Sequence, residues 1–129
     1  MARPTATQPT EVELQILGIL WEQKAATARE IHNRIVEVRE TNYSTTVKML
    51  SVMLEKGLVK RNDSVRPQLF RAAATQQKTQ TKMLKDLMQR AYDGSAGSLV
   101  LQALSSKKAT KAELAEIREM LDRLEGDKQ

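Results

Sequence analysis

Side chains that can donate hydrogen bonds or carry a positive charge share one face of a predicted helix at residues 43–57. This segment reads YSTTVKMLSVMLEKG, and the helical period of about 3.6 residues places its apolar side chains in one stripe. The opposite face, or its edge, carries Ser44, Thr45, Val47, Lys48 and Ser51. Because no acid occurs before Glu55, this face suits contact with a polyanion. The alternative is an ordinary surface helix that is rich in serine and threonine.

The buried stripe and both ends of this helix follow from the same segment. We expect the core-facing residues to be Thr46, Met49, Leu50, Met53 and Leu54. Ser44 is the predicted N-cap, because a serine side chain accepts hydrogen bonds from the first amides of a helix. Gly57 is predicted to take the left-handed conformation past the last turn.

Positive charge is concentrated directly after this helix. The chain has a net charge of +5, and residues 56–85 hold a single acid, Asp63. The basic residues of the same stretch are Lys56, Lys60, Arg61, Arg66, Arg71, Lys78, Lys82 and Lys85. A basic block beside a contact helix is typical of nucleic-acid binding. A membrane surface would also attract this charge, but no basic amphipathic stretch has the Trp, Phe and Leu face that an interfacial helix needs.

Two further helices are predicted before this segment, each opened by a capping box. In both motifs a threonine accepts from a backbone amide and a glutamate three residues later reaches back, as in Thr10 with Glu13 and Thr27 with Glu30. We expect the first helix to end near residue 23 and the second near residue 40. Their predicted buried residues are Leu14, Ile16, Leu17, Leu20, Trp21, Ala28, Ile31, Ile35 and Val38.

A β-hairpin is predicted after the third helix, with strands at residues 58–62 and 68–72. The intervening NDSVRP holds an Asp-Ser pair and a proline, which favour a turn. Three helices followed by two strands is the order of a winged helix-turn-helix, in which the second helix of a pair enters a DNA groove. With 40% hydrophobic and only 3% aromatic residues, the composition also favours helices. The predicted fold is therefore mainly α with a small β-hairpin.

Residues 75–129 are predicted to form a separate domain of three helices. Its candidate dimer contacts are the apolar residues Leu84, Leu87, Leu99, Leu101, Leu114, Ile117, Leu121 and Leu124. Narrow apolar stripes bury poorly within one chain, so we expect these helices to pack against a second copy. The alternative is that they fold back on the first domain. The predicted organisation is a flexible arm at 1–9, a winged-helix DNA-binding domain at 10–74 and a dimerisation domain at 75–129.

The sequence lacks the residues needed for catalysis and for cofactor or metal binding. There is no cysteine, so disulfides, thiolate metal sites and cysteine nucleophiles are excluded, and a cytoplasmic location is the natural expectation. The first residues lack the apolar region of a signal peptide, and no run is long enough to span a membrane. His32 is the one histidine and is interpreted as a surface residue. Without a phosphate loop or a Ser/His/Asp set, we expect no enzyme activity, no cofactor and no metal.

Three segments together resemble the penicillinase repressor family. They are TEVELQILGILW, the capped second helix followed by NYSTTVKMLSVMLEKGLVKR, and residues 92–101. The resemblance covers roughly residues 10–125. It implies a winged-helix N-terminal domain, a three-helix C-terminal dimerisation domain, and a homodimer that represses transcription by covering a palindromic operator in double-stranded DNA.

The resemblance also implies which residues contact DNA, because it places the start of the third helix in the major groove. These residues are Ser44, Thr45, Val47, Lys48, Lys60, Arg61 and Arg66, and the outward face of the helix adds Ser51 to the predicted DNA contacts. Thr45 can donate to or accept from any base, and Lys48 can reach guanine or phosphate. Some relatives carry a basic residue at the position of Val47. The three hairpin residues would contact phosphates, which position a protein without reading the sequence.

Two regulatory features of the family differ in this sequence. In β-lactam-responsive members, a membrane sensor protease pathway ends in cleavage of the repressor at an Asn-Phe bond of the C-terminal domain. The corresponding bond here is Gln102-Ala103, so cleavage at this place requires a different protease specificity. Copper-sensing relatives use a C-terminal cysteine cluster, which this chain lacks.

The sequence thus predicts a dimeric, sequence-specific transcriptional repressor of β-lactam-resistance or related genes. Its expected partners are operator DNA, a second copy of the chain, and a membrane sensor protease that acts directly or indirectly to relieve repression. The alternative is a winged-helix protein-interaction module without sequence-specific DNA binding, because a fold does not fix a function.

Overall fold

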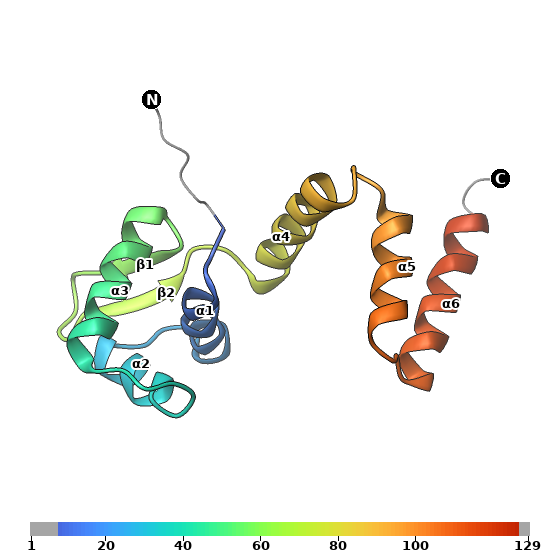
Figure 1. Cartoon of the computed structure of the whole chain (residues 1–129). Coiled ribbons are helices and arrows are strands. Elements are labelled where there is room, and N and C mark those ends of the chain that lie inside the picture. The colour runs from blue at the N-terminus through green and yellow to red at the C-terminus, as the bar shows by residue number, and fades with distance from the viewer. Residues whose placement is uncertain (1–7, 127–129) are drawn as a thin grey trace. The chain divides into compact units, whose positions relative to one another are not determined.

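The computed structural model of the chain describes residues 8–126, which hold six helices and one two-stranded hairpin (Figure 1). The helices are α1 (Glu11–Gln23), α2 (Ala28–Ile35), α3 (Tyr43–Lys56), α4 (Gln76–Ala91), α5 (Ala96–Ser106) and α6 (Lys111–Gly126), and the strands are β1 (Val59–Asn62) and β2 (Leu69–Ala72). This order is a winged helix-turn-helix followed by a helical domain, as the sequence predicts. The described residues divide into two compact units, and the division falls inside α4, between Met83 and Leu84.

Capping boxes start α1 and α2 as predicted. The Oγ1 of Thr10 accepts from the amide of Glu13 at 3.2 Å, and the amide of Thr10 donates to Glu13 Oε1 at 2.9 Å. Thr27 and Glu30 make the same reciprocal pair at 3.1 and 2.8 Å. Each box satisfies two amides that the first turn of a helix leaves without intrahelical partners.

The start of α3 differs from the prediction by two residues. Asn42 is the N-cap, and its Oδ1 accepts from the amide of Thr45 at 2.9 Å and from the hydroxyl of Ser44 at 2.9 Å. The prediction that Ser44 caps this helix is therefore wrong. Asparagine and serine are almost equally good caps. Asn42 is the cap here because Tyr43, the residue that follows it, is already helical. Gly57 takes the predicted left-handed conformation, with φ of 78°.

The α2 helix is shorter than predicted. It ends at Ile35, and residues 36–38 form a turn instead of continuing the helix to residue 40. Val38, which we expected to be buried, is 63% exposed. Since no glycine or proline marks the end of α2, its periodic pattern alone overestimates its length.

The core of the first unit lies where α1, α2, α3 and the hairpin meet. Its buried apolar residues are Ile16, Leu17, Ile19, Leu20, Ala26, Ile31, Ile35, Leu50, Met53, Val59 and Phe70. One buried charge accompanies them: Glu13 is 2% exposed and its Oε1 lies 2.7 Å from the Nζ of Lys56, the last residue of α3. This ion pair joins the first turn of α1 to the last turn of α3.

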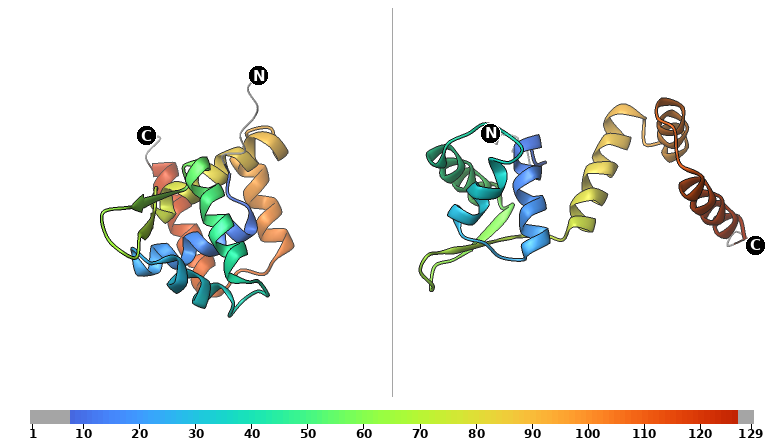
Figure 2. Two further views of the ribbon diagram at one scale, coloured as in Figure 1. Left: turned by 90° about the vertical axis from the view of Figure 1, so that its left-hand side faces the viewer. Right: turned by 90° about the horizontal axis from the view of Figure 1, so that it is seen from below.

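The hairpin is tied to the helices by its backbone. β1 and β2 pair antiparallel, with Val59 opposite Ala72 and Asn62 opposite Leu69, so each strand lies within one residue of its predicted start. Ala26, in the connection between α1 and α2, exchanges two further backbone hydrogen bonds with Phe70, at 3.0 and 2.8 Å. The bridge fixes β2 to the connection between α1 and α2, while the loop between the strands extends beyond the three helices (Figure 2).

The second unit consists of the last part of α4 with α5 and α6. Ser95 caps α5, and Thr110 and Glu113 form the predicted capping box of α6. The apolar side chains of α5 and α6 stay accessible, since none of the residues in these two helices is buried. Within residues 8–126, no helix is both long enough and apolar enough to cross a membrane.

Candidate nucleic-acid interface

The outward face of α3, formed by Ser44, Thr45, Val47, Lys48 and Ser51, is exposed along its whole length. On the opposite side, Thr46, Leu50 and Met53 are buried, as predicted, and Met49 and Leu54 are half-buried. The buried side chains fix the rotation of α3 about its own axis. The hydroxyls and the ammonium of the outward face are therefore held toward solvent, where they can reach a ligand.

His32 links α2 to the start of α3. Its Nδ1 lies 2.9 Å from the Oγ1 of buried Thr46, and its ring meets the ring of Tyr43 edge-on, with centroids 5.6 Å apart. The interpretation of His32 as a plain surface residue is thus wrong, because the side chain is half-buried and bonded. His32 thus joins α2 to the first turn of α3.

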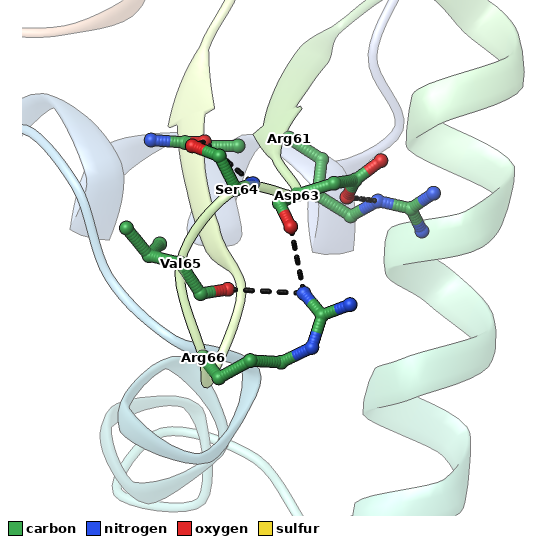
Figure 3. Close-up of polar contacts among 6 residues, drawn as sticks. Arg61, Asp63, Ser64, Val65 and Arg66 are labelled. Atoms are coloured by element: carbon green, nitrogen blue, oxygen red, sulfur yellow. Dashed lines mark hydrogen bonds and ion pairs between the residues drawn. The ribbon is translucent and has the colours of Figure 1, made fainter.

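The three predicted hairpin contacts are exposed, but two of them are held by the hairpin itself. Arg61 Nε donates to Asp63 Oδ1 at 2.6 Å, and Arg66 Nη1 donates to the carbonyl oxygens of Asp63 and Val65 at 2.7 and 3.1 Å (Figure 3). Asn62 Oδ1 closes the same loop by accepting from the amide and hydroxyl of Ser64. Lys60 lies on β1, opposite Arg71 of β2.

A groove of about 280 Å³ runs between the start of α2, the outward face of α3 and the hairpin. We call it the α3–hairpin groove, and its polar and charged lining includes Arg29, Tyr43, Ser51, Arg61 and Gln68, with Val47 beside them. No acidic residue lines it among the residues that the structure describes. The groove brings three of the predicted contact residues together: Val47, Ser51 and Arg61.

Other predicted contacts lie outside this groove. Thr45 lines a separate depression of about 210 Å³ on the other flank of α3, together with Arg39, Thr41 and Met49. Ser44, Lys48, Lys60 and Arg66 line neither hollow. Of the predicted contacts, Val47, Ser51 and Arg61 thus lie on one flank of α3 and Thr45 on the other.

Arg29 and Tyr43 belong to this surface and were missed by sequence reasoning. The Cζ of Arg29 lies 3.8 Å from the centroid of the Tyr43 ring. A basic residue in the first turn of α2 and an aromatic at the first position of α3 are visible in the sequence. Their contact is not visible in the sequence, because it depends on the angle between α2 and α3.

The charges on the far side of α2 are paired internally. Arg34 Nη2 lies 2.7 Å from Glu22 Oε1. This hydrogen bond, followed by the Coulomb attraction of Glu22, raises the pKa of the Arg34 guanidinium above its ordinary value. Within residues 8–126, no group of three or more His, Cys, Asp or Glu side chains is placed to hold a metal ion.

The residues predicted to form a dimer all lie in the second unit. Leu84, Leu87, Leu101, Leu121 and Leu124 are exposed, and Leu99, Leu114 and Ile117 are half-buried. Between α5 and α6 lies an apolar groove of about 730 Å³, lined in part by Leu99, Ile117, Leu121 and Leu124. Gln102 and Ala103 sit in the middle of α5, and both are exposed.

Comparison with known proteins gives one family. The model of the family described as "Penicillinase repressor" matches residues 9–123. A penicillinase repressor of Staphylococcus aureus is 24% identical over 110 residues, which cover 85% of this chain and 87% of the relative. The methicillin resistance regulatory protein MecI of Mammaliicoccus sciuri is 22% identical over 114 residues, which cover 88% and 93%. A MecI protein of Staphylococcus aureus strain N315 is 21% identical over 114 residues, which cover 88% of this chain and 93% of the relative.

Proposed function

This chain belongs to the penicillinase repressor family, and from that premise we propose that it represses transcription by binding a palindromic DNA operator as a homodimer. The observation that carries the proposal is the outward face of α3. It is exposed, holds hydroxyls and one lysine without an acid, and borders a groove that is lined by arginines and lacks acidic side chains. Such a surface matches the negative potential of a DNA groove.

Specific reading is assigned to the start of α3. Thr45 offers a hydroxyl to any base and a methyl group to thymine, and Lys48 can donate to guanine or to a phosphate. Val47 can make an apolar contact with a thymine methyl group. Ser44 and Ser51 lie at the edges of the same face and suit contacts to the sugar-phosphate backbone.

Lys60, Arg61 and Arg66 are assigned to phosphates beside the recognition helix. A phosphate oxygen can replace the internal acceptors that now hold the two arginines, namely the Asp63 carboxylate and the loop carbonyls. Contacts of this kind set the position of α3 without reading bases.

The dimer is assigned to the second unit, through Leu84, Leu87, Leu99, Leu101, Leu114, Ile117, Leu121 and Leu124. Large apolar side chains with no buried core of their own are typical of surfaces that pack against another chain. Two recognition helices brought together in this way would enter successive major grooves, with half-sites about one helical turn apart.

Relief of repression is assigned to proteolysis of α5, with a membrane sensor protease as the direct or indirect partner and β-lactam-resistance or related genes as the regulated set. The Gln102-Ala103 bond is exposed but helical, and the Gln102 carbonyl accepts from Ser106 Oγ at 2.6 Å. Because proteases bind extended chain, cleavage at this bond requires local unfolding of α5.

The test begins by selecting a duplex from a random pool with the wild-type protein. The variant Thr45→Ala/Lys48→Ala is then titrated against the selected duplex and a scrambled one, and each lost base contact should cost about 1–3 kcal/mol of binding free energy. Lys111→Ala, at the exposed start of α6, is the control for lost charge. Full-strength selective binding by the double variant would overturn the assignment of these two residues. No duplex binding at low salt would instead favour a protein-interaction module.

A further inference from the structure

Arg29 is placed to bind an anion at the edge of the α3–hairpin groove. It lies in the first turn of α2, it is exposed, and its side chain makes no ion pair or hydrogen bond with any residue between 8 and 126. All five N–H groups of the guanidinium are therefore available to a ligand.

The Tyr43 ring restricts how this guanidinium can lie. The Cζ of Arg29 is 3.8 Å from the ring centroid, close enough for stacking of the cation on the ring face. Stacking occupies one flat side of the guanidinium and leaves its N–H edge exposed. That edge is the part that pairs with a phosphate through two parallel hydrogen bonds.

The Tyr43 ring also contacts a side chain of α2. His32 meets it edge-on, at an interplanar angle of 83°, and His32 Nδ1 lies 2.9 Å from Oγ1 of buried Thr46. Tyr43 is thus a supported platform at the start of α3. A guanidinium placed on such a platform loses less freedom on binding than one on an unsupported side chain.

The groove also relates Arg29 to the residues proposed to contact DNA. Arg29 and Arg61 both line it, together with Val47 and Ser51 of the outward face of α3. A duplex that met α3 would therefore bring its backbone to the same groove. In a helix-turn-helix, the helix before the recognition helix crosses this backbone.

We propose that Arg29, stacked on Tyr43, forms a phosphate-binding site for the DNA backbone and so positions the recognition helix. The ligand is a phosphodiester, and the contact adds affinity without selecting bases. This inference rests on the proposed DNA binding, which it extends to a residue outside α3 and the hairpin.

The test compares Arg29→Ala with Arg118→Ala, which removes an exposed arginine from α6. Both are titrated against the selected duplex and a scrambled duplex over a range of salt concentrations. Arg29→Ala should weaken binding to both duplexes by the same factor, about tenfold for one charge-assisted contact. It should also reduce the slope of log affinity against log salt by about 0.9. Arg118→Ala should change neither quantity.

Variants of the platform separate stacking from charge. Arg29→Lys keeps the charge and should retain the salt slope, yet lose part of the affinity because an ammonium cannot stack flat and donate along one edge. Tyr43→Phe keeps the ring and should match the wild type. Tyr43→Leu should weaken binding, and adding it to Arg29→Ala should cost less than the two separate losses combined. Thermal unfolding of each variant shows whether α3 is intact.

Each outcome decides between this inference and the function on which it rests. If the wild type binds no duplex at low salt, both are wrong. If the wild type binds selectively and Arg29→Ala behaves as Arg118→Ala does, the phosphate site is wrong and the proposed function stands. If Arg29→Ala changes the preference at one base position, Arg29 is a base contact and the phosphate assignment is wrong.

Discussion

The carboxylate of Asp63 holds the guanidinium of Arg61, with Oδ1 and Nε 2.6 Å apart. Asp63 is the single acid between residues 56 and 85, and it lies in the hairpin loop beside the proposed DNA contacts. It also presents its backbone carbonyl to Arg66 (Figure 3). In the proposed complex, one residue therefore competes with phosphate for two of the three hairpin arginines, Arg61 and Arg66.

We expect Asp63→Asn to bind DNA more tightly, because Arg61 no longer has to leave an ion pair. Exposed ion pairs contribute up to about 1 kcal/mol, so affinity should rise by up to about fivefold, and equally for selected and scrambled duplexes. Fluorescence anisotropy titrations at fixed salt measure this change. Asp122→Asn removes the same charge from α6 and is the control. Unchanged or weaker binding by Asp63→Asn would show that Asp63 does not restrain Arg61.

The cap of α3 can be tested with two neighbouring variants. Asn42→Ala removes the side chain that accepts from the Thr45 amide, and its cost should be about 1 kcal/mol of unfolding free energy. Ser44→Ala removes a hydroxyl that only donates to Asn42, and it should cost clearly less. Urea unfolding followed by circular dichroism measures both. A larger loss for Ser44→Ala would restore serine as the cap.

The ion pair between Glu13 and Lys56 should matter more to stability than the exposed pairs. Glu13 is buried and Lys56 is only 18% exposed, so Lys56→Ala leaves a buried carboxylate without its cation. We expect a loss of about 3 kcal/mol, the lower end of the range for broken buried pairs. Arg34→Ala breaks the exposed pair with Glu22 and should cost about 1 kcal/mol or less.

The double variant Glu13→Gln/Lys56→Met adds a sharper comparison, because it removes both charges together. It should be more stable than Lys56→Ala, since no unpaired charge remains in the core. Chemical denaturation of all three variants under one condition decides this point. Equal losses for Lys56→Ala and Arg34→Ala would mean that burial does not strengthen the Glu13 pair.

The assignment of the dimer to the second unit predicts a change in sedimentation. Leu101 is 69% exposed, so Leu101→Glu should leave the helices folded while placing a charge in the proposed contact. The wild type should sediment as a dimer and Leu101→Glu as a monomer at the same concentration. Val38→Glu, 63% exposed in the first unit, is the control and should stay dimeric. A dimeric Leu101→Glu protein would exclude Leu101 from the contact.

Local signals in the sequence were sufficient for most of the fold. The paired Thr and Glu of each capping box, the left-handed Gly57 and the apolar period of α3 each act within a few residues, so the elements could be predicted closely. The end of α2 and the choice between Asn42 and Ser44 could not, because neighbouring candidates have nearly equal local free energies. Tertiary packing decides between them.

For the candidate site too, one part could be predicted from the sequence and another part could not. The outward face of α3 follows from helical periodicity, and Thr46, Leu50 and Met53 are buried opposite it. The contacts of Arg29 with Tyr43 and of His32 with Thr46 could not be predicted, since each depends on where α2 meets α3. The engagement of Arg61 by Asp63 depends on the conformation of the hairpin loop.

The backbone bridge between Ala26 and Phe70 has a consequence for how this protein can evolve. Its hydrogen bonds use amides and carbonyls, which every residue except proline supplies in full, so they do not constrain the side chains of the hairpin loop. Substitutions in the loop can therefore change the hydrogen bonds that its own side chains make without breaking this bridge. Descendants of one ancestral chain could exchange their hairpin loops while inheriting the same helical framework.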